Sequence, residues 1–259
     1  MANDTVGRTF LVAFLVCFVC SLLVSGTTAG LRAKKERDAL VRHYRDVLAV
    51  TGLLASTDDV YAFWKDNVVP RLVELETGSY SAAFEPEAFN QQRAAGDPSL
   101  NRTIPSDLDI AGLRTRSRFA PVYLIRQEGE IRQVVLPVHG KGLWSTLYGY
   151  LALKPDLRTV AGFGFYEHGE TPGLGGEVDN PQWLAQWPGK EVFNDQGEVA
   201  IEVLRGQVDE DSAKARYQVD GISGATMTIR GVTNLLRYWL GADGFGPYLE
   251  RLRQEGFND

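Results

Sequence analysis

The chain has 259 residues, and 44% of them are hydrophobic, which is enough for one large folded domain with a real core. Its formal net charge is −6 at pH 7. Binding to a nucleic-acid backbone needs clustered Lys and Arg, and no segment supplies such a cluster. We therefore exclude a nucleic-acid-binding protein and expect no nucleic-acid partner.

The N-terminal part contains an apolar stretch over residues 9–31 without a charged side chain. About 20 consecutive apolar residues cross a bilayer as one helix, so we expect a transmembrane helix over 9–31, behind a short tail over 1–8. A cleavable signal peptide is the alternative, because residues 25–30 are small enough for a peptidase. The apolar run exceeds the usual core of about 7 to 15 residues in a signal peptide, and we favour an uncleaved anchor.

The charges that flank this stretch point to one orientation without deciding it. Arg8 precedes the stretch, whereas Arg32, Lys34, Lys35 and Arg37 follow it. The positive-inside rule would therefore place the large C-terminal part in the cytoplasm. Long domains can be translocated despite flanking charge, so the charge count alone leaves the side of the membrane open.

Cysteine and histidine usage limits the metal chemistry. Cys17 and Cys20, the only cysteines, lie in the apolar stretch, where a free cysteine behaves as a small hydrophobic residue. The rest of the chain offers no thiolate ligand for zinc or an iron–sulfur cluster. His43, His139 and His168 are widely separated. We expect no metal site.

The remaining chain reads as one α+β domain. We expect a helical stalk over residues 32–56, then a domain over 57–259 that begins with a helix near 58–67 and a short strand over 71–75. Alternating apolar residues on both sides of turn residues predict two hairpins, and hence a mostly antiparallel sheet flanked by helices. The hairpin strands are expected over 121–126, 131–138, 147–154 and 159–166. Later segments predict a helix over 181–187, a strand over 198–204, a helix from Ala225 to Gly241 and a last helix over 248–254.

Two glycine-rich loops follow predicted strands. Residues 139–145 read HGKGLWS, in which glycines allow close approach to a ligand and Trp144 offers a flat face. Residues 168–177 read HGETPGLGGE, in which Glu170 and Thr171 could face a polar heterocycle. Each loop taken alone could equally be an ordinary structural loop.

The stretch DGISGAT, residues 220–226, leads into a helical pattern. We expect Asp220 or Ser223 to cap this helix and Thr226 to lie in its first turn, where free N–H groups and the helix dipole favour an anion such as phosphate. An ordinary capped turn is the alternative. A nucleophilic Ser223 is a weaker one, because the elbow sequence and an acid to orient a histidine are both missing.

Together the pieces resemble a known family. The N-terminal apolar stretch, the GKGLWS loop, the segment HGETPGLGGEVDNPQW and DGISGAT resemble the C-type subunit of the sodium-translocating NADH:quinone reductases over the whole chain. They are more distantly similar to the flavin-bearing G-type subunit of the ferredoxin-linked electron transport complex. The last piece matches the flavinylation pattern Asp-x-x-Ser/Thr-Gly-Ala-Thr at every specified position.

The resemblance implies an FMN joined through its phosphate to the hydroxyl of Thr226. It also implies that Asp220, Ser223, Gly224 and Ala225 are recognised by a flavin transferase that uses FAD as donor with magnesium. The candidate contacts of the flavin are Trp144, Glu170, Thr171, Gly173, Leu174, Gly175 and, for the phosphate, Arg230. A bound flavin would carry the electrons while the protein positions it and tunes its potential.

The function implied is that of an electron-transfer subunit in a membrane complex that oxidises NADH, reduces ubiquinone and exports sodium. Such a subunit is anchored in the bacterial inner membrane, contacts other subunits and places its soluble domain in the periplasm, against the charge count. The G-type subunit of the sister complex and a module that holds flavin without a covalent bond are the alternatives. The long insertion between the anchor and the GKGLWS loop favours the C-type subunit.

Overall fold

The computed structural model describes residues 6–54 and 59–257, without the side chains of residues 33 and 36. The chain divides into two units, the first ending at Tyr44 and the second beginning at Arg45. Helix α1 (Val6–Gly30) and most of α2 (Arg32–Ala49) belong to the first unit. Residues 1–5 of the expected tail, and the expected boundary between stalk and domain at residues 56 and 57, lie outside the described residues.

Helix α1 is long and apolar enough to cross a membrane by length and composition. It has 25 residues, its mean hydropathy reaches 2.5 over an 18-residue window, and none of that window is buried against protein. The stretch expected as a span over 9–31 is helical as far as Gly30. These properties are consistent with a single-pass anchor.

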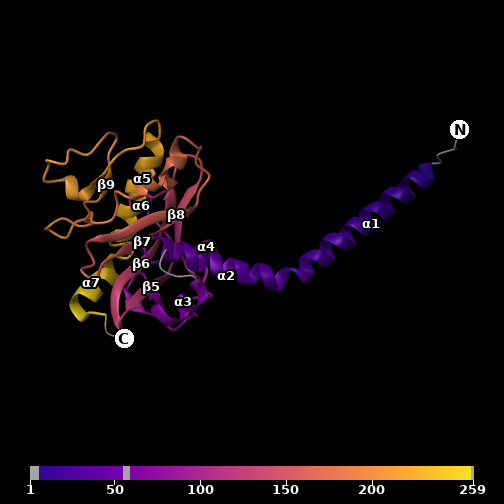
Figure 1. Ribbon diagram of the computed structural model, residues 1–259, viewed down its shortest axis with the longest axis horizontal. Coiled ribbons are helices and arrows are strands. Elements are labelled where there is room, and N and C mark those ends of the chain that lie inside the picture. The colour runs from indigo at the N-terminus through magenta and orange to yellow at the C-terminus, as the bar shows by residue number, and fades with distance from the viewer. Residues whose placement is uncertain (1–5, 55–58, 258–259) are drawn as a thin grey trace. The chain divides into compact units, whose positions relative to one another are not determined.

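The second unit is built on a six-stranded sheet in the order β2-β1-β5-β6-β7-β8, and every neighbouring pair is antiparallel. Figure 1 shows β5 to β8 with α6 beside them. The two predicted hairpins are confirmed as β5–β6 and β7–β8. The strands are β1 (Val68–Glu74), β2 (Ser79–Tyr80), β5 (Phe119–Gln127), β6 (Glu130–Lys141), β7 (Thr146–Leu153) and β8 (Val160–Glu167).

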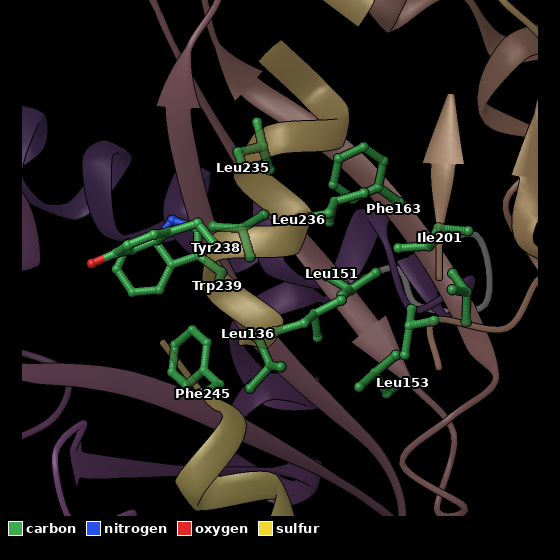
Figure 2. Packing of buried hydrophobic residues seen from close by; sticks show 14 of the residues in the cluster. Leu136, Leu151, Leu153, Phe163, Ile201, Leu235, Leu236, Tyr238, Trp239 and Phe245 are labelled. Carbon is green, nitrogen blue, oxygen red and sulfur yellow. The ribbon is translucent and has the colours of Figure 1, made fainter. Parts of the chain in front are cut away.

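Side chains alternate between the two faces of this sheet, as the pleat requires. Val122 and Leu124 of β5 join the main core cluster, whereas Tyr123 between them packs its ring 5.3 Å from that of Trp64 in α3 (Val60–Asn67). Helix α6 (Thr226–Leu240) covers the first face. Figure 2 shows its leucines and aromatic residues packed against sheet residues; the labelled side chains from these elements are Leu136, Leu151, Leu153, Phe163, Leu235, Leu236, Tyr238 and Trp239.

Smaller elements complete the fold. Helix α4 (Gln91–Gly96) and the antiparallel pair β3 (Asn101–Thr103) and β4 (Thr115–Ser117) lie in the insertion before β5. The later elements are the short helices η2 (Gly175–Asp179), α5 (Pro181–Leu184) and η3 (Ala215–Tyr217), the parallel pair β9 (Glu202–Val203) and β10 (Gln218–Val219), and the last helix α7 (Gly246–Glu255).

Three predicted elements are shorter than expected. The helix of the stalk expected over 32–56 ends at Ala49, and the chain then turns through Gly52 in a left-handed conformation, φ +75°. The strand predicted over 198–204 is reduced to β9, because residues 198–200 fold back locally: Asn194 N donates to Glu198 O, and Ala200 N donates to Val192 O. The helix predicted over 181–187 ends at Leu184. Trp187, beyond that end, is buried in the core, and Pro188 follows it.

Candidate functional site

The three glycine-containing stretches meet at the N-terminal end of α6. A Cβ atom added at Gly224, in DGISGAT, would lie 2.8 Å from Leu174 Cδ2 in the loop after β8. One added at Gly175 would lie 2.5 Å from Thr228 Oγ1 in the first turn of α6. Trp144 N in the β6–β7 loop donates to Glu170 Oε1 over 3.0 Å. Segments far apart in sequence thus form one site.

Helix α6 begins at Thr226 and has no side-chain cap. Ala225 occupies the N-cap position, so the expected capping by Asp220 or Ser223 is wrong. Asp220 Oδ1 instead accepts a hydrogen bond from Val208 N over 2.7 Å. Between Ser223 and the helix, the chain turns through Gly224 in a left-handed conformation, φ +73°, which favours glycine. Neither side chain therefore reaches the first N–H groups of the helix.

An uncapped helix start leaves N–H groups for another acceptor. The Thr226 side chain is exposed there, at the positive end of the helix dipole. Arg230, one turn later, is also exposed, and no carboxylate pairs with it among the described residues. The positive charge of Arg230 and the free N–H groups of the helix start suit the binding of an anion, and the Thr226 hydroxyl lies beside these N–H groups.

Glu170 lies beneath this turn and is only 5% exposed. Oε1 accepts from Trp144 N and Ser145 N, and Oε2 accepts from Leu143 N and, over 2.6 Å, from the Thr228 hydroxyl. Burial disfavours the carboxylate, but these hydrogen bonds, the one from Thr228 foremost, outweigh it and hold the pKa of Glu170 below its ordinary value. Its charge is therefore satisfied by the protein itself.

His168 has an acid partner that the sequence did not reveal. Its Nε2 lies 2.7 Å from Asp179 Oδ2, and its Nδ1 accepts from Glu170 N over 3.2 Å. An accepting Nδ1 carries no hydrogen, so Nε2 donates to Asp179. Both ring nitrogens are committed, and this histidine is not available as a base for Ser223.

Exposed apolar side chains lie on the three segments that converge at the start of α6. Trp144 is 71% exposed and Met227 is 51% exposed, and Leu143 and Leu174 are also exposed. Isolated exposed apolar residues are common on proteins, but four on three converging segments offer a surface for a flat ring system. Thr171 and Gly173 are exposed on the same loop as Leu174, whereas Gly175 is buried.

His139, which opens the first glycine-rich stretch, does not belong to the site. Its ring lies 4.7 Å from that of Trp239, near the C-terminal end of α6, and 5.5 Å from that of Tyr148. Burial lowers the pKa of His139 to about 4, so its imidazole is neutral near pH 7.

Thr228, Ser145 and Asp179 were missed by the sequence reasoning. Thr228 carried a usable signal: successive helical residues are rotated by about 100°, so a threonine two positions after an exposed one faces inward. No comparable sequence signal marks Ser145 or Asp179, because their partners lie on other segments. The Oγ of Ser145 accepts from Gly169 N over 2.6 Å, and Asp179 pairs with His168.

The chain is similar to known proteins over the segments that form this site. Residues 142–241 match the FMN-binding domain family. The chain is 47% identical to the C-type subunit of the Na(+)-translocating NADH-quinone reductase of Pseudomonas aeruginosa, over 98% of this chain and 99% of that one. It is 41% identical to the corresponding C-type subunit of Yersinia pestis, over 97% of this chain and 95% of that one.

A solved structure has the same fold. The crystal structure of Shewanella oneidensis NqrC matches with a TM-score of 0.78 and 37% identity, over 86% of this chain and all of that chain. The sequence identity extends over nearly the full length, and the FMN-binding match includes the β6–β7 loop, the loop after β8 and the start of α6. The chain belongs to the NqrC family, the C-type subunits of the Na(+)-translocating NADH-quinone reductases.

Proposed function

We propose that this protein carries FMN joined by a phosphoester bond to Thr226, and that it relays electrons within a sodium-translocating NADH:ubiquinone reductase. The observation that carries the proposal is the exposed Thr226 hydroxyl at the uncapped start of α6, within a segment that matches the flavinylation pattern. Membership of the NqrC family supports the same conclusion.

The chemistry of attachment agrees with this position. With FAD as donor, the Thr226 oxygen bonds to the flavin-side phosphorus, the pyrophosphate bond breaks, AMP leaves and the hydroxyl proton is released. The resulting phosphodiester keeps one negative charge, which the N–H groups of the helix start stabilise. Arg230 adds a positive charge one turn away. The attachment is then both covalent and electrostatic.

The residues around Thr226 fit the rest of the group. Trp144 and Leu174 would present apolar surface to the isoalloxazine ring, and Thr171, Gly173 and Gly175 belong to the loop that would line it. Glu170, in the same loop, binds the β6–β7 loop and the Thr228 hydroxyl. Asp220, Ser223, Gly224 and Ala225 are the positions that a flavin transferase would read. When bound, FMN supplies electron transfer, and the protein supplies its position and surroundings.

Membership of the family supports a role within a membrane complex. The relatives named above are subunits of Na(+)-translocating NADH-quinone reductases. We propose that α1 anchors this chain in the bacterial inner membrane, that the domain lies in the periplasm, and that electrons arrive from and leave to cofactors of partner subunits. A covalent bond would retain the flavin where no cytoplasmic pool could replace it.

In-gel fluorescence of the denatured protein tests the covalent bond. Full-length chain coexpressed with an active flavin transferase should give a flavin-fluorescent band, and Thr226→Ala should abolish it. Mass spectrometry should place FMN, less one water, on the peptide that contains Thr226. Thr103→Ala, an exposed threonine outside the FMN-binding match, serves as the matched control and should keep the band.

A dark wild-type band in the presence of active transferase would contradict the covalent proposal. Flavin that is released on denaturation would instead indicate a non-covalent flavin-binding module. Protease added to spheroplasts tests the side of the membrane: a periplasmic domain should be degraded while a cytoplasmic marker survives. Protection of the domain under those conditions would contradict the orientation.

A further inference from the structure

The Glu170 carboxylate joins two segments that carry the proposed flavin site. Three of its donors are the backbone N–H groups of Leu143, Trp144 and Ser145, at 3.3, 3.0 and 3.3 Å. The fourth donor is the hydroxyl of Thr228, at 2.6 Å, in the first turn of α6. One side chain therefore holds the β6–β7 loop against the turn that begins with Thr226.

Two glycines, Gly142 and Gly175, lie so close to the Glu170 carboxylate that a side chain at either position would collide with it. A Cβ added at Gly142 would lie 2.6 Å from Glu170 Oε1, and one added at Gly175 would lie 2.8 Å from Glu170 Oε2. Such distances are below van der Waals contact. Because both positions are glycine, the β6–β7 loop and the loop after β8 can pack against the carboxylate. Both loops therefore contribute to its burial.

The two threonines of the first turn are in opposite situations. Thr228 is fully buried, and its hydroxyl is bound to Glu170, whereas Thr226 is exposed. A hydroxyl that donates to a buried carboxylate cannot approach a phosphorus atom in solvent without breaking that bond. The Thr226 hydroxyl is therefore accessible from solvent for attachment, whereas the Thr228 hydroxyl is not.

We propose that Glu170 is a positioning residue for flavin attachment: by binding the Thr228 hydroxyl and the N–H groups of the β6–β7 loop, it fixes the turn that presents Thr226. This inference rests on the proposed attachment at Thr226. It gives Glu170 a role before any flavin is bound. Loss of a hydrogen bond to a buried charge is costly, so removing the carboxylate should free both segments.

Two measurements on the full-length chain in mild detergent test this role. In flavin-free protein, expressed without the transferase, Glu170→Gln should raise hydrogen exchange at the N–H groups of Leu143, Trp144 and Ser145 by about tenfold. With purified transferase, FAD and magnesium, the rate of covalent flavin incorporation should fall by about tenfold. The flavin that is incorporated should show lower fluorescence anisotropy than in the wild type.

Matched variants separate positioning from packing. Thr228→Val keeps the shape but removes the hydroxyl and should also slow incorporation, whereas Thr228→Ser keeps the hydroxyl and should restore the wild-type rate. Glu167→Gln, an exposed carboxylate three residues before Glu170, should match the wild type in both assays.

Wild-type exchange and wild-type incorporation in Glu170→Gln would overturn the inference, as would a Thr228→Ser variant as slow as Thr228→Val. Failure of the proposed function looks different. Covalent flavin on Thr226→Ala would refute attachment at Thr226, while the exchange result, measured without flavin, would stand.

Discussion

Replacing Gly231 by alanine sets helix propensity against packing. Gly231 lies inside α6, where alanine is intrinsically more favourable than glycine by about 1 kcal/mol. In an exposed helix, Gly231→Ala would therefore stabilise the protein. Here a Cβ atom at this position would collide with the carbonyl oxygen of Lys141 and lie 3.2 Å from Gly142 Cα. Both contacts are with backbone, so neither can be relieved by a side-chain rotation.

We expect the steric clash of the added Cβ atom to outweigh the gain in helix propensity. Overpacking a close contact costs typically about 1–3 kcal/mol, and a clash with rigid backbone belongs at the upper end. Subtracting the gain in propensity leaves a net destabilisation of about 1–2 kcal/mol. For a unit of this size, the midpoint of thermal unfolding should fall by roughly 2–8 °C. Because Lys141 and Gly142 lead into the β6–β7 loop, flavin incorporation should slow as well.

Urea unfolding of the full-length chain, followed by tryptophan fluorescence, measures the effect, because Trp187 and Trp239 are fully buried. Gly206→Ala is the control: a Cβ there would meet nothing within 4 Å, and the change should be neutral or stabilising by up to about 1 kcal/mol. A Gly231→Ala variant as stable as the wild type, or more stable, would refute the packing argument.

Three further predictions concern the core behind the site. The pKa of His139 is lowered from 6.5 to about 4, so as the pH falls the unfolded chain binds this proton before the folded chain does. The free energy of unfolding should therefore fall by about 3 kcal/mol between pH 6.5 and 4. In urea titrations at several pH values, His139→Gln should reduce this dependence of stability on pH. Trp239→Phe should lose about 2–3 kcal/mol in the free energy of unfolding, since Trp239 Nε1 donates to His139 O over 2.6 Å and is fully buried; a loss below about 0.5 kcal/mol would contradict this. Trp183→Phe should raise hydrogen exchange in residues 220–226, because Trp183 Nε1 donates to Asp220 O over 2.8 Å; unchanged exchange there would show that this contact does not hold the segment.

Local features were predictable from the sequence because their causes lie within a few neighbouring residues. The apolar stretch over 9–31, the alternation that forms β5 to β8, and the periodicity that forms α6 each report the burial of one element. The DGISGAT pattern located Thr226 at the start of a helix for the same reason. The capping prediction failed because it needed a side-chain direction, which the left-handed turn at Gly224 changes.

Contacts between distant segments were decided by the tertiary structure. Glu170 and Thr228 are 58 residues apart, and their hydrogen bond exists because β6–β7, the loop after β8 and α6 converge at one end of the sheet. Periodicity shows which face of an element is buried, but it does not show which residue of another element that face meets. Local patterns in the sequence therefore predicted the apolar helix, the sheet and the place of Thr226 at the start of a helix, whereas the folded arrangement alone brings Glu170 against the Thr228 hydroxyl and the β6–β7 loop.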